Sequence, residues 1–131
     1  MKWESKGKKK KYSFNRLVHS FVYAFQGIIQ CFRTEQNILI HTIATVFVIL
    51  LGFVLNITRL EFLALVLVIG LVISLEMINT SIEYTIDMAM PEIHPLAKAA
   101  KDIAGGAVLF AAMTAVVVGL IIFVPYIMEL L

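Results

Sequence analysis

Apolar positions recur in helical steps over residues 13–32. Residues three and four apart share one face of a helix, and here one face is apolar and the opposite face polar. The apolar face carries Phe14, Leu17, Val18, Phe21, Val22, Phe25, Ile28, Ile29 and Phe32, and the polar face carries Asn15, Arg16, His19, Ser20, Gln26 and Gln30. Because a helix with a basic polar face is typical of the membrane interface, we expect a surface helix over 13–32.

Three longer apolar segments follow, at about 36–57, 61–90 and 97–128. Each is at least as long as the ~20 residues that a helix needs to cross the ~30 Å hydrocarbon core of a bilayer. Asn56 to Arg59 marks a short turn between the first two segments, and Pro91 to Pro95 breaks the chain before the third. The pattern therefore predicts an all-α integral membrane protein, with an N-terminal amphipathic surface helix and three transmembrane helices.

Composition agrees with a membrane protein. Hydrophobic residues make up 60% of the 131 residues and charged residues 15%, whereas a soluble domain is nearer half apolar and a quarter charged. We expect a single domain over 13–131 at this length. Cys31 is the one cysteine, so the chain cannot form an intrachain disulfide.

Basic residues are distributed unevenly and predict the topology. Residues 1–12 form a lysine-rich tail, and Lys98 and Lys101 follow the second span, whereas only Arg59 lies between the first two spans. Because cytoplasmic loops are enriched in Lys and Arg, we expect the N-terminus and the 88–102 loop in the cytoplasm and the C-terminus outside. The tail itself is interpreted as a topology signal that also attracts anionic lipid.

Polar residues interrupt the second span near its cytoplasmic end. They fall within about 100° of one another on one helix face and comprise Glu76, Asn79, Thr80, Glu83 and Asp87. A carboxylate in hydrocarbon is costly, so such residues usually face a polar cavity and mark function. The alternative is that Glu76 is neutral and packs by hydrogen bonding across a helix interface. A row of several polar groups favours function.

The polar groups at this depth suit phosphoryl transfer at the membrane interface. Glu35 and Glu83 would supply the one or two protein carboxylates with which Mg²⁺ is commonly held beside substrate phosphates. Lys101 and Arg16 would balance phosphate charge, and Glu76 would accept a proton from a lipid alcohol.

Several of these residues also have plainer interpretations. Glu35 and Glu92 are compatible with solvated interface charges, and Lys101 and Asp102 with a charge pair at a helix start. His94 is compatible with a loop residue that has no chemical task.

His41 lies on the first span with Thr42 and Thr45. A single histidine beside two hydroxyls favours hydrogen bonding between helices over metal ligation. The sequence lacks a G-x-x-x-x-G-K-[ST] loop, the glycine-rich, H-R-D and D-F-G motifs of protein kinases, and a nucleophile elbow. These absences exclude the common soluble nucleotide-binding folds, and no nucleic-acid partner is expected.

The second span and the segment after it resemble a known family. EMINTSIEYTID (Glu76 to Asp87) followed by HPLAKAAKDIAGGAV (His94 to Val108) is similar to the signature of the prokaryotic diacylglycerol kinase family, in which E-x-x-N-[ST]-x-I-E-x-x-x-D precedes A-K-D. The similarity runs from about Phe14 to Leu120 in one register. HPLAKAAKD, and SFVYAFQGI ahead of FRTEQN, look most like the Gram-positive branch, whose members phosphorylate undecaprenol and recycle the lipid carrier of cell-wall synthesis.

The resemblance implies a kinase of the bacterial plasma membrane that uses ATP and Mg²⁺, assembled as a homotrimer with active sites between protomers. It places Glu76 at the position of the catalytic base, and Glu35 and Glu83 at those of the magnesium ligands. The implied nucleotide-contacting positions are Arg16, Tyr23, Glu35, Glu83, Glu92, His94, Lys101 and Asp102. The implied lipid-contacting positions are Arg16, Glu76, Asn79 and Gly105.

Two departures from the diacylglycerol branch affect this transfer of roles. Met90-Pro91 replaces the polar pair usual before the acidic loop residue, which weakens the implied contacts at Ile93 and His94. Gly105 stands where a serine is common.

The sequence therefore predicts a lipid kinase with undecaprenol as its acceptor. Diacylglycerol is the alternative acceptor, because both lipids offer a primary alcohol at the same depth. A small proton-coupled transporter subunit or a non-catalytic scaffold is a more distant alternative. A transporter needs a polar path to the outer face, whereas the polar groups here gather on one side of the membrane.

Overall fold

The structure is entirely helical over the residues that it describes. The computed structural model describes residues 13–131, and the lysine-rich tail expected at 1–12 lies outside them. Four helices follow one another: α1 (Phe14–Thr34), α2 (Gln36–Val54), α3 (Arg59–Ala89) and α4 (Pro95–Glu129). The four helices expected from the sequence are confirmed. α2 ends at Val54 rather than near residue 57, and α4 begins at Pro95 rather than near residue 97.

Three of the helices are long and apolar enough to cross a membrane. α2 has 19 residues, α3 has 31 and α4 has 35. At ~1.5 Å per residue α3 is ~46 Å long and α4 ~52 Å, which exceeds the ~30 Å hydrocarbon core. The chain is therefore a multi-pass membrane protein, and its longer spans are tilted or extend beyond the hydrocarbon.

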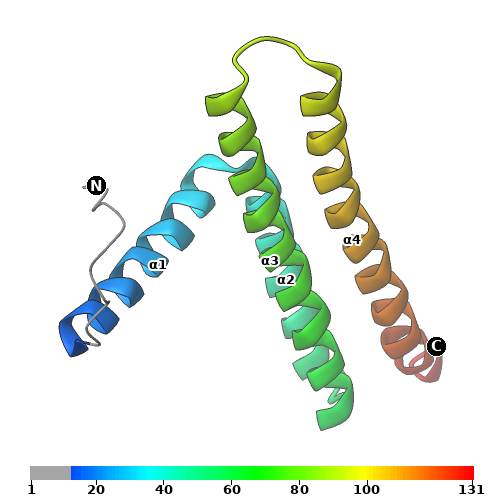
Figure 1. Cartoon of the computed structure of the whole chain (residues 1–131). Coiled ribbons are helices and arrows are strands. Elements are labelled where there is room, and N and C mark those ends of the chain that lie inside the picture. Colours follow the sequence, from blue (N-terminus) through cyan, green and yellow to red (C-terminus); the bar gives the residue numbers. More distant parts are fainter. Residues whose placement is uncertain (1–12) are drawn as a thin grey trace.

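α3 is the helix that the other three contact (Figure 1). α4 packs against it in antiparallel direction, with the closest association in the chain, and α2 runs alongside it. α1 leaves the start of α2 at a slant and diverges from α3 (Figure 1). Near the C-terminal end of α1, Cys31 Sγ donates a hydrogen bond to Thr80 Oγ1 of α3 at 3.7 Å.

Local sequence determines the turn between α2 and α3. Asn56 has φ of 51°, in the left-handed region that asparagine tolerates better than most residues. Thr58 caps α3 through a capping box, in which Glu61 N–H donates to Thr58 Oγ1 at 3.3 Å and Thr58 N–H donates to Glu61 Oε2 at 2.7 Å. Tyr126 Oη donates to the same carboxylate oxygen at 2.8 Å, so this contact attaches the end of α4 to the turn.

A cluster of buried apolar side chains lies at this same end of the bundle and consists of Ile57, Leu65, Ile122 and Phe123. Gly52 packs beside it, because a Cβ at this position would lie 3.0 Å from Ile57 Cδ1 and 3.0 Å from Phe62 Cζ. Most of the large apolar side chains elsewhere on the helices are exposed, as expected where lipid or further protein chains cover them.

Candidate active site

A buried carboxylate lies on α3 where it faces α2. Glu76 is 3% exposed, and its Oε1 lies 3.2 Å from His41 Nε2 on α2, within ion-pair distance. A carboxylate at this depth is costly unless a partner compensates its charge or its hydrogen-bonding capacity. The interpretation of His41 as a polar link between two helices agrees with this contact.

The polar row continues one turn further along α3. Asn79 Nδ2 donates to Glu83 Oε1 at 3.0 Å, a contact between residues four apart on one helix face. Asn79 is 8% exposed, and its Oδ1 is buried without a hydrogen-bond partner within residues 13–131. Because buried polar atoms are normally satisfied, this oxygen is available to accept from a substrate hydroxyl or a hydrated cation.

Glu35 forms the single-residue break between α1 and α2. Its backbone is extended, with φ −104° and ψ 114°, so the chain changes direction here. Tyr84 Oη of α3 donates to Glu35 Oε1 at 3.4 Å and lies 3.2 Å from Thr34 Oγ1. These contacts hold the corner between α1 and α2 against α3. Tyr84 was missed in the sequence, where its only signal is a hydroxyl directly after Glu83.

Glu35 and Glu83 offer carboxylate oxygens, which are ligands of the type that Mg²⁺ accepts. Glu83 is engaged by Asn79 and Glu35 by Tyr84, and no group of three or more His, Cys, Asp or Glu side chains is arranged to hold a metal ion in the described part of the chain. Mg²⁺ prefers oxygen ligands and commonly takes only one or two protein carboxylates, with water and phosphate completing its shell. The site therefore suits a cation that arrives together with a nucleotide.

Charged residues also gather where α3 connects to α4. Lys101 Nζ of α4 pairs with Asp87 Oδ1 of α3, and Lys98 Nζ pairs with Asp102 Oδ2 within α4 at 2.5 Å. The interpretation of Lys101 and Asp102 as paired charges near the start of a helix agrees with these contacts, although the two residues do not pair with each other. They lie on adjacent positions of the helix, and each reaches an oppositely charged partner elsewhere.

His94 is the N-cap residue of α4, and its Nδ1 accepts a hydrogen bond from Leu96 N–H at 3.2 Å. This capping contact gives the residue a structural task that the loop interpretation did not foresee. A pocket of about 240 Å³ lies beside it, lined by Ile86, Asp87, Met90, Pro91, Glu92, Ile93, His94, Ala97, Lys98, Lys101 and Asp102. Four of the expected nucleotide positions, Glu92, His94, Lys101 and Asp102, therefore share one pocket.

α1 carries two more of the expected nucleotide positions, Arg16 and Tyr23, and presents them away from this site. Arg16 is exposed, and Tyr23 is 66% exposed with its ring stacked on that of His19 at 6.2 Å. Arg16 lies fifteen residues before Cys31, where α1 meets α3, which is ~22 Å along the helix. Within one chain the structure does not bring Arg16 to Glu76.

A cavity of about 450 Å³ lies between α1 and α3 and is lined by Gly27, Gln30, Cys31, Met77, Thr80, Ser81, Tyr84, Thr85 and Met88. Gly27 belongs to the same face of α1 as Tyr23, four residues apart. Gly105, on α4, is half-buried, and a Cβ at its position would meet no atom within 4 Å. The serine common here in the diacylglycerol branch would therefore fit without strain.

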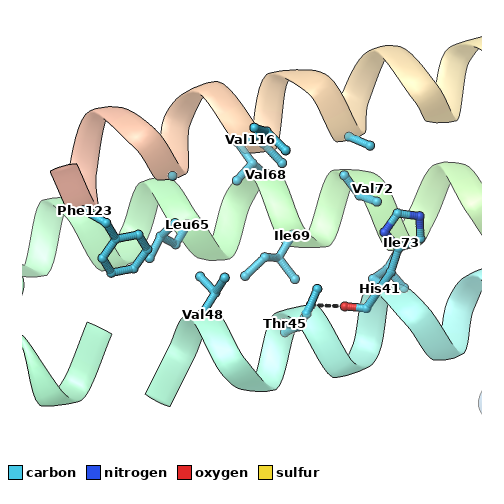
Figure 2. A pocket seen from close by; sticks show the side chains of 14 residues that line it. His41, Thr45, Val48, Leu65, Val68, Ile69, Val72, Ile73, Val116 and Phe123 are labelled. Atoms are coloured by element: carbon cyan, nitrogen blue, oxygen red, sulfur yellow. Dashed lines mark hydrogen bonds between the residues drawn. The ribbon is translucent and has the colours of Figure 1, made fainter. Parts of the chain in front are cut away.

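A third space is an apolar groove of about 270 Å³ formed by α2, α3 and α4 (Figure 2). Phe123 and Leu65 lie at one end of the row of lining side chains, and His41 lies at the other (Figure 2). Thr45 Oγ1 donates to the backbone oxygen of His41 at 2.8 Å. The His41 ring is thus the main polar surface of a groove within the membrane-spanning part of the protein.

Taken together, the three apolar spans and the buried polar row of α3 define a multi-pass membrane protein with an acidic site near one end of its helices. The chain belongs to the prokaryotic diacylglycerol kinase family, whose sequence profile matches residues 22–123, and it is a lipid kinase. Because the chain belongs to a family of lipid kinases, the alternatives of a transporter subunit and a non-catalytic scaffold no longer apply.

Relatives of both acceptor specificities are similar to this chain. The undecaprenol kinase of Bacillus subtilis (strain 168) is 44% identical over 111 residues, covering 85% of this chain and 90% of that protein. The diacylglycerol kinase of Synechocystis sp. is 40% identical over 116 residues, covering 88% of this chain and 66% of that protein. The diacylglycerol kinase of Escherichia coli (strain K12) is 26% identical over 104 residues, covering 79% and 85%.

Proposed function

We propose that this lipid kinase transfers the γ-phosphate of ATP to undecaprenol at the cytoplasmic face of the bacterial plasma membrane. The product, undecaprenyl phosphate, would re-enter cell-wall synthesis as lipid carrier. Similarity supports this acceptor, since the chain is 44% identical to an undecaprenol kinase and 40% and 26% identical to two diacylglycerol kinases. Diacylglycerol is the alternative acceptor.

The observation that carries the chemistry is the burial of Glu76 beside α2. In the proposed reaction Glu76 accepts the proton of the lipid hydroxyl as the hydroxyl oxygen attacks the γ-phosphorus, and ADP leaves. Asn79 lies on the same face of α3, and its Oδ1, which has no hydrogen-bond partner within residues 13–131, accepts a hydrogen bond from the acceptor or from a water molecule. Gly105 leaves room for the lipid on α4.

Glu35 and Glu83 would hold Mg²⁺ with the nucleotide phosphates. When bound, the ion would neutralise the charge that develops on the transferred phosphoryl group. Glu92, His94, Lys101 and Asp102 are proposed to contact the nucleotide in the pocket at the connection between α3 and α4. Lys101 would then exchange its contact with Asp87 for one with phosphate.

A homotrimer with sites between protomers accounts for the separation of the proposed residues. Arg16 lies ~22 Å along α1 from the contact between α1 and α3, so its proposed contacts with nucleotide and lipid require a site completed by another copy. Tyr23 lies on the same diverging helix. The exposed apolar surface of the four helices offers area for such an assembly, with the N-terminus and the 88–102 loop in the cytoplasm.

A direct comparison of acceptors tests this function. Purified protein in lipid nanodiscs, given labelled ATP and Mg²⁺, is expected to phosphorylate undecaprenol with a higher kcat/KM than diacylglycerol, at matched mole fractions of the two lipids. A higher kcat/KM for diacylglycerol would assign the protein to the alternative acceptor.

A further inference from the structure

The side chain that meets Glu76 from the neighbouring helix is His41. The side chain of His41 is 27% exposed and that of Glu76 is 4% exposed, with 3.2 Å between Nε2 and Oε1. The two residues come from α2 and α3. The contact therefore links the two helices at the depth of the proposed base.

The surroundings of this contact are apolar. His41 lies at the end of the groove of α2, α3 and α4, next to Val72 and Ile73 (Figure 2). Thr45, the other polar residue of the groove, gives its hydroxyl hydrogen to the backbone oxygen of His41. Electrostatic contacts are stronger where water is excluded, so the His41 ring has a large influence on the carboxylate that it faces.

We propose that His41 is a positioning residue of the lipid kinase: it holds Oε1 of Glu76 and leaves Oε2 for the hydroxyl of the acceptor. This inference rests on the proposed role of Glu76 as the base. The terminal torsion of a glutamate is broad, whereas a general base must lie about 2.6–3.2 Å from the group that it deprotonates. His41, on the neighbouring helix α2, restrains the orientation of the Glu76 carboxylate.

Two substitutions separate a positioning contact from simple packing. His41→Phe keeps a ring but removes the nitrogen that faces Glu76, and His41→Gln keeps a hydrogen-bond donor but removes the ring. Displacement of a reacting group by ~1 Å costs about 100-fold in rate. We therefore expect kcat of His41→Phe to fall about 100-fold, with the KM for MgATP unchanged, and His41→Gln to recover most of that loss.

Thr45→Val is the matched control, because it alters the same face of α2 one turn away without contacting Glu76. It is expected to turn over undecaprenol at the wild-type rate. Size-exclusion chromatography verifies that each variant is assembled. Should His41→Phe aggregate, His41→Leu supplies the variant without a donor in a smaller volume.

The outcomes distinguish this inference from the proposed function. If Glu76→Gln retains full turnover, the assignment of the base fails and the inference fails with it. If Glu76→Gln is inactive while His41→Phe turns over normally, only the positioning role is wrong. Equal losses in His41→Phe and His41→Gln would overturn it in favour of a packing role.

Discussion

At the scale of single residues, the acidic site depends on how a charge is accommodated in the membrane. Glu76 is 3% exposed and faces His41, whereas Glu83, two turns along the same face, is half-buried and bonded to Asn79. Different environments along one helix suit similar side chains to different chemistry. The deeper carboxylate suits proton transfer, and the shallower one suits a cation.

Glu76→Gln is the substitution that tests the proposed base. The amide keeps the shape of the side chain but cannot accept the proton of the acceptor hydroxyl. Since general base catalysis typically contributes 10²–10⁴-fold, kcat should fall by roughly that factor, while ATP binding measured by fluorescence or calorimetry persists. Glu61→Gln, at the opposite end of α3, is the control, because glutamine also serves in a capping box. Equal activity of the two variants would contradict the assignment.

Part of this site was predictable from periodicity alone. Glu76, Asn79 and Glu83 share a face of one helix, and this follows from their spacing of three and four residues in the sequence. The partners across helices were not predictable, because nothing in the sequence states that His41 lies at the depth of Glu76 or that Tyr84 reaches Glu35. Such pairs depend on how the helices are offset and rotated relative to each other.

At the scale of elements, the end of the bundle opposite the acidic site holds a cluster of buried apolar side chains. The turn at Asn56, the capping box of Thr58 and Glu61, and the contact with Tyr126 join α2, α3 and α4 there. The helix boundaries were predictable to within a few residues. α2 ends early because the left-handed backbone of Asn56 reverses the chain, and α4 starts early because Pro95 is favourable at the first position of a helix.

Gly52 tests this packing. A Cβ there would lie 3.0 Å from Ile57 Cδ1 and Phe62 Cζ, whereas a Cβ at Gly70 would meet nothing within 4 Å. Overpacking a core typically costs 1–3 kcal/mol, so Gly52→Val should lower the Tm measured in detergent. Gly70→Val introduces the same side chain into open space and should leave the Tm near that of wild type. A Tm loss at Gly70 as large as at Gly52 would count against the packing explanation.

At the scale of the whole molecule, a single chain does not bring together all the residues proposed to act in the reaction. Glu76 and Glu83 lie on α3, while Arg16 lies at the far end of the diverging helix α1 (Figure 1). The helices were predictable from the sequence but their separation in space was not, since an amphipathic pattern does not specify the direction in which a helix leaves its neighbour. Assembly is what would bring these groups together.

Mixing two inactive variants tests a site shared between copies. Arg16→Ala and Glu76→Gln chains, co-expressed and purified together through different tags, should form assemblies in which some sites combine an intact Arg16 with an intact Glu76. In a cyclic trimer that contains both chains, roughly one of the three sites combines an intact Arg16 with an intact Glu76, so activity should return to about a third of the wild-type value. Co-purified Glu76→Gln chains alone provide the background, and activity no higher than this background would indicate that both residues act within one chain.

Glu35 is the single non-helical residue between α1 and α2, and this geometry has a mechanical consequence. α1 acts as a lever of ~32 Å that pivots at its C-terminal end, so a tilt of about 10° moves its far tip by roughly 5 Å. The carboxylate at the pivot, restrained by Tyr84, hardly moves. Changes in lipid packing that tilt α1 will therefore displace Arg16 long before they disturb Glu35.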